Sequence, residues 1–222
     1  MKVKLVGITK PVNQNYGETT EDIVSYCARV SNPKNQKNFT TSSKLLSYMI
    51  REGHWSPFEM VHLTIEIETT RDIARQILRH RSFSFQEFSQ RYADPTKELK
   101  FVNREARLQD PKNRQNSIEL DALHLELDDA WKRKQLNIVS STMNAYRWAI
   151  DNGIAKEQAR AVLPEGLTES RLYMSGNLRS WIHYCQLRMG NGTQLEHIKI
   201  ANKCWNILEE EFPEVTDAIN NL

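Results

Sequence analysis

A strictly alternating segment in the first third of the chain does most to limit the folds open to it. Apolar residues occupy every second position and polar residues the positions between, namely Val61, Leu63, Ile65 and Ile67 against His62, Thr64, Glu66 and Glu68. Side chains two apart in a strand share a face, so 60–69 is predicted to be a strand with one face on the core. Thr69 or Thr70 can cap a following helix with Ile73 and Ile77 on its buried side.

The remaining elements follow from hydrophobic spacing, capping residues and breakers. Further strands are predicted at 2–8, 99–102 and 167–175, and further helices at 18–30, 41–50, 116–152, 155–163, 177–189 and 193–212. The polar segment 103–117 is predicted to be a mobile loop. Because no internal repeat or linker interrupts this series, we expect one α+β domain over 1–222, with long helices packed on a small, mostly antiparallel sheet.

Composition and charge exclude several classes of protein. The net charge of +2 is too balanced for a surface that grips nucleic acid, so any basic site is local. No apolar run is long enough to cross a bilayer, and the first ten residues lack the features of a signal peptide. Cys27, Cys185 and Cys204 are odd in number and have no metal-ligand spacing. We expect a cytoplasmic chain with no membrane contact, no disulfide and no bound metal.

Arginines and aromatic residues are concentrated between 71 and 92. The arginines there are Arg71, Arg75, Arg79, Arg81 and Arg91, and phenylalanines alternate with serines after them. Planar guanidinium groups beside hydroxyls and rings suit a phosphorylated ligand that contains a ring, although a buried salt-bridge network would have the same composition. Successive side chains on a helix point about 100° apart. Arg79, His80 and Arg81 therefore favour two neighbouring ligands, or one ligand lying across the helix end.

Five polar motifs follow one another along the chain. They are Cys27-Ala28-Arg29-Val30-Ser31, Gly53-His54-Trp55-Ser56-Pro57-Phe58-Glu59, Arg79-His80-Arg81 with Ser89-Gln90-Arg91, Ala159-Arg160-Ala161-Val162-Leu163-Pro164, and Asn177-Leu178-Arg179-Ser180 with Leu187-Arg188. In content and order they resemble the motifs of the flavin-dependent thymidylate synthases, whose signature is Arg-His-Arg, seven residues and then Ser-x-Arg. The resemblance extends from about residue 28 to residue 196.

The resemblance implies the reductive methylation of dUMP to dTMP. Methylenetetrahydrofolate would supply the carbon, FAD would carry the hydride, and NADPH would reduce the FAD. A homotetramer with active sites between subunits is also implied. None of the cysteines lies in the Pro-Cys setting that the other type of thymidylate synthase needs. Hydride delivery from a flavin, with arginines that stabilise charge on the pyrimidine, is a sufficient alternative.

The resemblance further implies a role for each motif residue. dUMP would be bound by Gln76, Arg79, Glu87, Ser89, Gln90, Arg91, Arg160 and Arg188. FAD would be contacted by Ser31, Ser56, Arg79, His80, Arg81, Glu87, Asn177, Arg179 and His183. The catalytic positions would be Arg188, which polarises the uracil, Ser89 and His54. Ser89 has no adjacent base and would act as a ligand to dUMP, and His54 would lie at the flavin or folate side.

Two positions depart from the family pattern, and both concern FAD affinity. Gly192 stands where some relatives have histidine, and His183 stands where some have asparagine. Two other functions stay open. A nucleic-acid-binding module would pair arginines with stacked bases, but it needs a broader basic surface. An inactive or altered flavoprotein on the same scaffold would bind another nucleotide.

Overall fold

Four antiparallel strands form the central sheet of the computed structural model, which describes residues 1–121 and 123–222. Their order across the sheet is β1 (Lys2–Ile8), β2 (His62–Thr70), β6 (Glu169–Asn177) and β3 (Ser84–Glu87). Ile65 of β2 pairs with Leu5 on one side and with Met174 on the other, so the alternating apolar residues continue across the strands. The strand predicted at 60–69 is confirmed and lies at the centre of the sheet.

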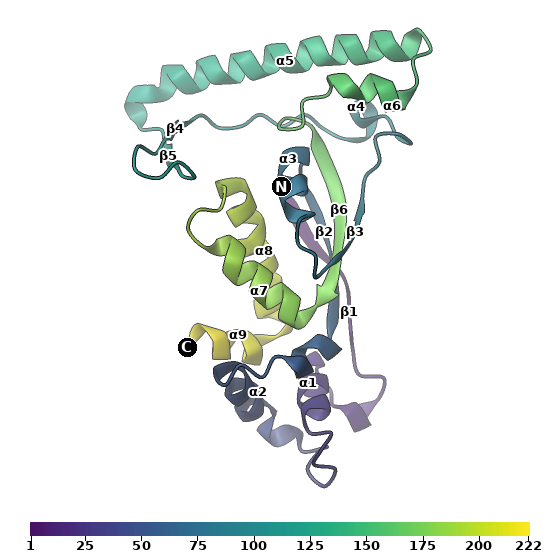
Figure 1. The fold of residues 1–222 in the computed structure, drawn as a ribbon, viewed down its shortest axis with the longest axis vertical. Coiled ribbons are helices and arrows are strands. Elements are labelled where there is room, and N and C mark those ends of the chain that lie inside the picture. Colours follow the sequence, from purple (N-terminus) through teal and green to yellow (C-terminus); the bar gives the residue numbers. More distant parts are fainter.

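Helices cover the apolar face of this sheet (Figure 1). α7 (Leu178–Met189) and α8 (Leu195–Glu211) pack on each other and on the sheet. α1 (Thr20–Ala28), α2 (Ser42–Arg51) and α9 (Pro213–Asn220) lie together at one end of the molecule. At the other end, α3 (Arg71–Ile77) follows β2, and α5 (Leu125–Asp151) runs across the molecule beside the short helices α4 (Pro95–Glu98) and α6 (Lys156–Ala159). The α+β prediction is confirmed.

The connection that leads to α5 differs from the prediction. β4 (Arg107–Gln109) pairs with β5 (Ser117–Glu119), so 103–117 contains one strand of a hairpin and is not only a loop. Because 117–119 takes part in this pairing, the helix predicted from 116 is wrong at its start and begins at Leu125. The strand predicted at 99–102 is reduced to a single bridge between Phe101 and Thr168.

Other differences lie in one short strand and at helix ends. β3 was not predicted, because its phenylalanines were assigned to a ligand loop, whereas Phe83 and Phe85 pack against the core. The last predicted helix begins after Gln194, and a separate helix, α9, follows it from Pro213. Asn177 caps α7 as predicted and accepts the backbone N–H of Ser180 at 2.8 Å.

Gly176 allows the chain between α3 and β3 to approach the sheet closely. A Cβ atom at this position of β6 would overlap the ring of Phe83. The same ring meets Trp181 edge-on, with 4.9 Å between the ring centroids. The segment that carries the Arg-His-Arg signature is therefore packed directly on β6 and α7.

A buried carboxyl group joins α1 to α9. Glu21 is only 4% exposed, and its Oε1 accepts the backbone N–H of Val215 at 2.8 Å. Burial raises the pKa of Glu21 to about 7, and the charge of Glu214 adds to this effect while the Val215 hydrogen bond opposes it. The folded chain therefore holds a proton on Glu21 that the unfolded chain releases at lower pH.

We expect Glu21→Gln to stabilise the protein at pH 8 by about 1–3 kcal/mol. The pKa is higher in the folded state, so the stability that protonated Glu21 provides is present below about pH 4.5 and is lost as pH rises through about 7. Glutamine keeps the acceptor for Val215 and does not ionise. Urea unfolding between pH 4.5 and 8 measures the difference, which should shrink as pH falls. The exposed Glu18→Gln is the control, and a constant difference across this range would contradict the prediction.

Candidate functional site

The three residues of the Arg-His-Arg signature follow the end of α3 and differ in exposure. α3 begins at Arg71 and ends at Ile77, with Arg79, His80 and Arg81 just beyond. Arg79 and Arg81 are exposed, and neither forms an ion pair with any residue that the structure describes. His80 instead is half-buried against α7. The three side chains therefore have different surroundings, but they lie on a turn after α3 and not on the helix that was predicted to carry them.

One group of predicted residues meets between α3, α7 and α8. This His80 group consists of Gln76, His80 and Arg188. Nε of Arg188 donates to Nε2 of His80 at 2.8 Å, and the Tyr184 ring lies edge-on to His80 at 4.9 Å between centroids. Burial, with a smaller effect from the Arg188 charge, lowers the pKa of His80 to about 4. His80 is thus neutral at pH 7, accepts through Nε2 and carries its proton on Nδ1.

A second group lines a hollow of about 390 Å³ beside the start of α3. This Arg160 group consists of Arg71, Arg75, Gln90 and Arg160. Gln90 is 4% exposed, and its Nε2 has no hydrogen-bond partner among the described residues. Leaving a buried donor unpaired is costly, so this amide suits an acceptor supplied by a ligand. Three guanidinium groups around such a donor make the hollow suitable for an anion such as a phosphate.

Carboxylates hold the arginines around this hollow. Glu165 lies 3.2 Å from Nη2 of Arg75 and 3.9 Å from Nε of Arg71. Arg91, next to Gln90 in the chain, reaches Glu157 at 3.3 Å. The alternative of a salt-bridge network is therefore partly realised. It leaves the amide of Gln90 unpaired, however, and this atom marks the hollow as a site for a ligand.

Glu87 and Ser89 connect β3 with this second group. Oε1 of Glu87 accepts from the Ser170 hydroxyl at 2.7 Å and lies 3.7 Å from Nη1 of Arg71. The Ser89 hydroxyl accepts the backbone N–H of Arg91 at 3.4 Å, and no histidine or lysine bonds to it in the described chain. Ser89 therefore lacks the base that a nucleophile needs, and its assignment as a dUMP ligand stays a prediction.

A third group gathers where α7 begins, beside the 3-10 turn Ser56–Met60. Asn177 forms the cap, Arg179 pairs with Glu59, and the His183 ring meets Trp55 edge-on at 4.8 Å between centroids. Burial, followed by the charge of Arg179, lowers the pKa of His183. A helix N-terminus with a cation beside two aromatic rings favours an anionic or aromatic ligand, although Arg179 is already paired with Glu59.

Besides the exposed Arg79 and Arg81, two further predicted residues, Ser31 and His54, lie outside these groups. Ser31 is exposed after α1, and no hydrogen bond or ion pair in the described chain joins it to another predicted residue. His54 is exposed in the loop after α2, where its ring meets Tyr48 at 5.8 Å between centroids. Their assignments to FAD and to the flavin or folate side stay predictions.

Several polar residues of these groups were given no individual role from the sequence, although Arg71 and Arg75 belong to its arginine-rich segment. Arg71, Arg75 and Glu165 line the second hollow, and Glu196 and His197 lie buried beside Gln76. The sequence could have indicated that His197 is buried, because it shares the inward face of α8 with 200, 201 and 204. The predicted inward residues Leu195 and Ile198 are only partly buried.

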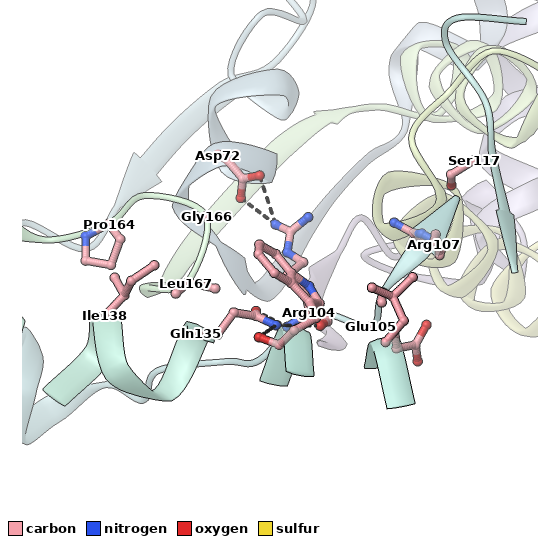
Figure 2. Close-up of a pocket in the computed structure, with 13 residues that line it drawn as sticks. Asp72, Arg104, Glu105, Arg107, Ser117, Gln135, Ile138, Pro164, Gly166 and Leu167 are labelled. Atoms are coloured by element: carbon pink, nitrogen blue, oxygen red, sulfur yellow. Dashed lines mark hydrogen bonds and ion pairs between the residues drawn. The ribbon is translucent and has the colours of Figure 1, made fainter. Parts of the chain in front are cut away.

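A larger hollow of about 700 Å³ is lined by no residue of the three groups (Figure 2). It is bounded by α5, the segment before β4 and the 164–167 loop, and Figure 2 shows Arg104 bonded to Asp72 on one side of it. Leu127, Trp131 and Ile138 contribute apolar surface from α5, and each is more than 40% exposed. This part of α5 is an uncovered apolar face.

The cysteines and the acidic residues add no further chemistry. All three thiols are free, and burial raises the pKa values of Cys27, Cys185 and Cys204. They are thus neutral and poorly nucleophilic. Among the described residues, no three His, Cys, Asp or Glu side chains are grouped to hold a metal, and no helix combines the length and apolar character needed to cross a membrane.

An arginine-lined hollow with an unpaired buried amide, together with a separate neutral histidine held by arginine, points to the class of proteins that bind phosphorylated ligands. The family model described as "Thymidylate synthase complementing protein" matches residues 14–214. The chain is 48% identical over 220 residues to a probable flavin-dependent thymidylate synthase of Paramecium bursaria Chlorella virus 1, with 99% of each chain covered. It is 47% identical over 225 residues to the flavin-dependent thymidylate synthase of Synechocystis sp., again with 99% of each covered.

Solved structures agree with these relatives. The UMP/dUMP methylase PolB from Streptomyces cacaoi, solved with 5-Br dUMP, superimposes with a TM-score of 0.81 at 25% identity, covering 100% of this chain and 95% of that chain. The chain belongs to the flavin-dependent thymidylate synthase family.

Proposed function

We propose that this protein methylates dUMP to dTMP, with methylenetetrahydrofolate as carbon donor, FAD as hydride carrier and NADPH as reductant. The observation that carries the proposal is the unpaired, buried amide of Gln90 in a hollow lined by Arg71, Arg75 and Arg160. The names of the two relatives at 47–48% identity and the dUMP analogue bound to PolB support the same substrate. They favour this activity over an inactive flavoprotein and over a nucleic-acid-binding module.

The nucleotide is bound by residues of the His80 and Arg160 groups, with Arg79 and Arg91 from outside them. Arg91 and Arg79 take the phosphate, while Gln90 and Arg160 add a buried amide and a further cation. Arg188 polarises the uracil, and its hydrogen bond to neutral His80 fixes the direction of the guanidinium group. Gln76, Glu87 and Ser89 complete the dUMP contacts.

The flavin is held chiefly by the group at the start of α7. Arg179 and the α7 N-terminus favour the diphosphate, while Ser56, Asn177 and His183 surround it. His80, Arg81, Arg79, Glu87 and Ser31 contribute the remaining contacts. FAD, when bound and reduced by NADPH, would supply the hydride that turns the transferred carbon into a methyl group.

The active site is shared between copies of the chain in a homotetramer. Gln76, His80 and Arg188 belong to one set of contacts, whereas Gln90 and Arg160 line a separate hollow. The uncovered apolar face of α5 supports assembly, since a patch of this kind is typical of protein interfaces. Because the three free thiols suit a reducing compartment, we also place the enzyme in the cytoplasm.

We expect Arg91→Ala to raise the dissociation constant of dUMP at least tenfold while flavin binding is retained. Loss of a charge-assisted phosphate contact accounts for a factor of about this size. The wild-type protein should purify with a flavin absorption band that NADPH bleaches, and calorimetry then measures dUMP binding to both proteins. Arg114→Ala, which removes an exposed arginine in the β4–β5 connection, is the matched control. A colourless protein that takes up no FAD, or unchanged dUMP affinity in Arg91→Ala, would overturn the proposed function.

A further inference from the structure

A row of hydrogen-bonded side chains runs from the buried Tyr184 through Gln76 to the buried Glu196. The Tyr184 hydroxyl lies 3.1 Å from Nε2 of His197, and Nδ1 of His197 lies 3.3 Å from Oε1 of Gln76. Nε2 of Gln76 donates to Oε1 of Gln194 at 2.8 Å, and Nε2 of Gln194 donates to Oε2 of Glu196 at 2.9 Å. Five side chains are thus connected end to end.

The carboxylate at the end of this row decides the direction of every hydrogen bond in it. Ionised Glu196 can only accept, so Gln194 must turn its NH₂ toward Glu196 and its oxygen toward Gln76. Gln76 must then turn its NH₂ toward Gln194 and its oxygen toward His197. It follows that the proton of neutral His197 is on Nδ1, and that Nε2 accepts from the Tyr184 hydroxyl.

Charges around Glu196 keep it ionised. Arg107 approaches its Oε1 at 2.5 Å and Arg104 its Oε2 at 3.4 Å. Burial alone would raise the pKa of Glu196, but its hydrogen bonds and these two arginines lower it. Arg104 is itself held by Asp72 at 2.6 Å, the contact drawn in Figure 2. The direction of the row is thus set outside the hollow that Gln90 lines.

His197 holds Gln76 from the buried side of the row. Its side chain is fully buried, and burial, followed by the charges of Arg188 and His80, lowers its pKa to about 4. A neutral imidazole has one N–H and one acceptor, and both are used here. Gln76 is therefore held from both sides, with one N–H of its amide and one lone pair of its oxygen left for a ligand.

We infer that Gln194, Glu196 and His197 are positioning residues that fix the amide of Gln76 in one orientation for dUMP. This inference rests on the proposed function, in which Gln76 contacts the nucleotide. If the Gln76 amide could flip by 180°, it would present its NH₂ where the ligand needs an acceptor. Flipped molecules would bind dUMP less well, and the average affinity would fall. The hydrogen-bonded row removes that freedom before the ligand arrives.

Gln194→Ala tests the row at a partly exposed residue, so folding should be preserved. We expect the dissociation constant of dUMP, measured by calorimetry on FAD-loaded protein, to rise about fivefold, the size of one lost net hydrogen bond. FAD uptake and kcat at saturating dUMP should change less than twofold. Gln186→Ala, which removes an exposed glutamine on α7, should leave dUMP affinity unchanged.

A pair of substitutions at His197 separates positioning from packing. His197→Leu removes the N–H that Gln76 accepts and should raise the dUMP dissociation constant five- to tenfold. His197→Asn keeps an N–H near the position of Nδ1 and should restore most of the affinity, although both variants lower the melting temperature. Unchanged dUMP affinity in Gln194→Ala and in His197→Leu would overturn the inference while Arg91→Ala still supports the proposed function. A wild-type protein that binds no dUMP would overturn both.

Discussion

Replacing Arg188 with alanine should lower kcat for dUMP methylation by about 10²–10³, the loss typical of removing one preorganised donor that stabilises developing charge. The guanidinium group is partly buried and fixed by its 2.8 Å hydrogen bond to neutral His80. Alanine removes the cation and leaves His80 without a partner at Nε2. Tritium release from dUMP labelled at C5 measures turnover, and the flavin absorption band reports that the fold and cofactor site are kept.

Two comparisons make this result decisive. Arg188→Lys keeps the charge but loses the planar fork, so it should recover only part of the rate. Mixed tetramers of Arg188→Ala and Arg91→Ala chains should regain roughly a quarter of the wild-type sites, if each site takes these arginines from different copies. Full activity in Arg188→Ala would remove this residue from the mechanism, and no recovery on mixing would contradict the shared site.

The largest loss of stability is expected for Trp181→Ala, at about 3–5 kcal/mol. Trp181 is fully buried on α7, meets the rings of Phe83 at 4.9 Å and Tyr184 at 5.8 Å, and donates from Nε1 to the carbonyl of Leu63 at 3.4 Å. Alanine leaves a cavity between helix and sheet and removes this hydrogen bond. Urea unfolding at one fixed protein concentration measures the change.

Tyr92→Ala supplies the control for this substitution. Tyr92 is 82% exposed, and its loss should change the free energy of unfolding by about 0.5 kcal/mol or less. If Trp181→Ala were as stable as Tyr92→Ala, the junction between α7 and the sheet would not be the centre of the core. A loss of flavin in Trp181→Ala without a loss of stability would instead assign the residue to the cofactor site.

Local sequence patterns predicted correctly those helices and strands whose formation depends mainly on residues nearby in the sequence. The alternation in 60–69 predicts β2 because one face of that strand packs on the core. Asn177 predicts the start of α7 because its side chain caps the helix directly. The start of α5 could not be found in this way, since Ser117–Glu119 pairs with β4 and a strand pairing competes with the helix.

The site shows the same division between local and distant contacts. The Arg-His-Arg signature indicated a ligand site, yet its surroundings depend on residues far along the chain. Gln76 and His197 are 121 positions apart, and Arg188 and His80 are 108 apart. No spacing rule connects such pairs, and the buried Glu196 on α8 gave only a weak signal within an otherwise apolar stripe.

Gly176 has no side chain of its own, yet it helps to determine where the signature residues lie. Because it lacks a Cβ atom, the Phe83 ring fits against β6, and the centroid of this ring lies 6.4 Å from that of the His80 ring. Even a methyl group at 176 would lift the aromatic ring and the signature segment with it. We therefore expect substitutions at Gly176 to be tolerated less well than substitutions at many exposed arginines. The packing of the signature segment requires that position 176 has no side chain.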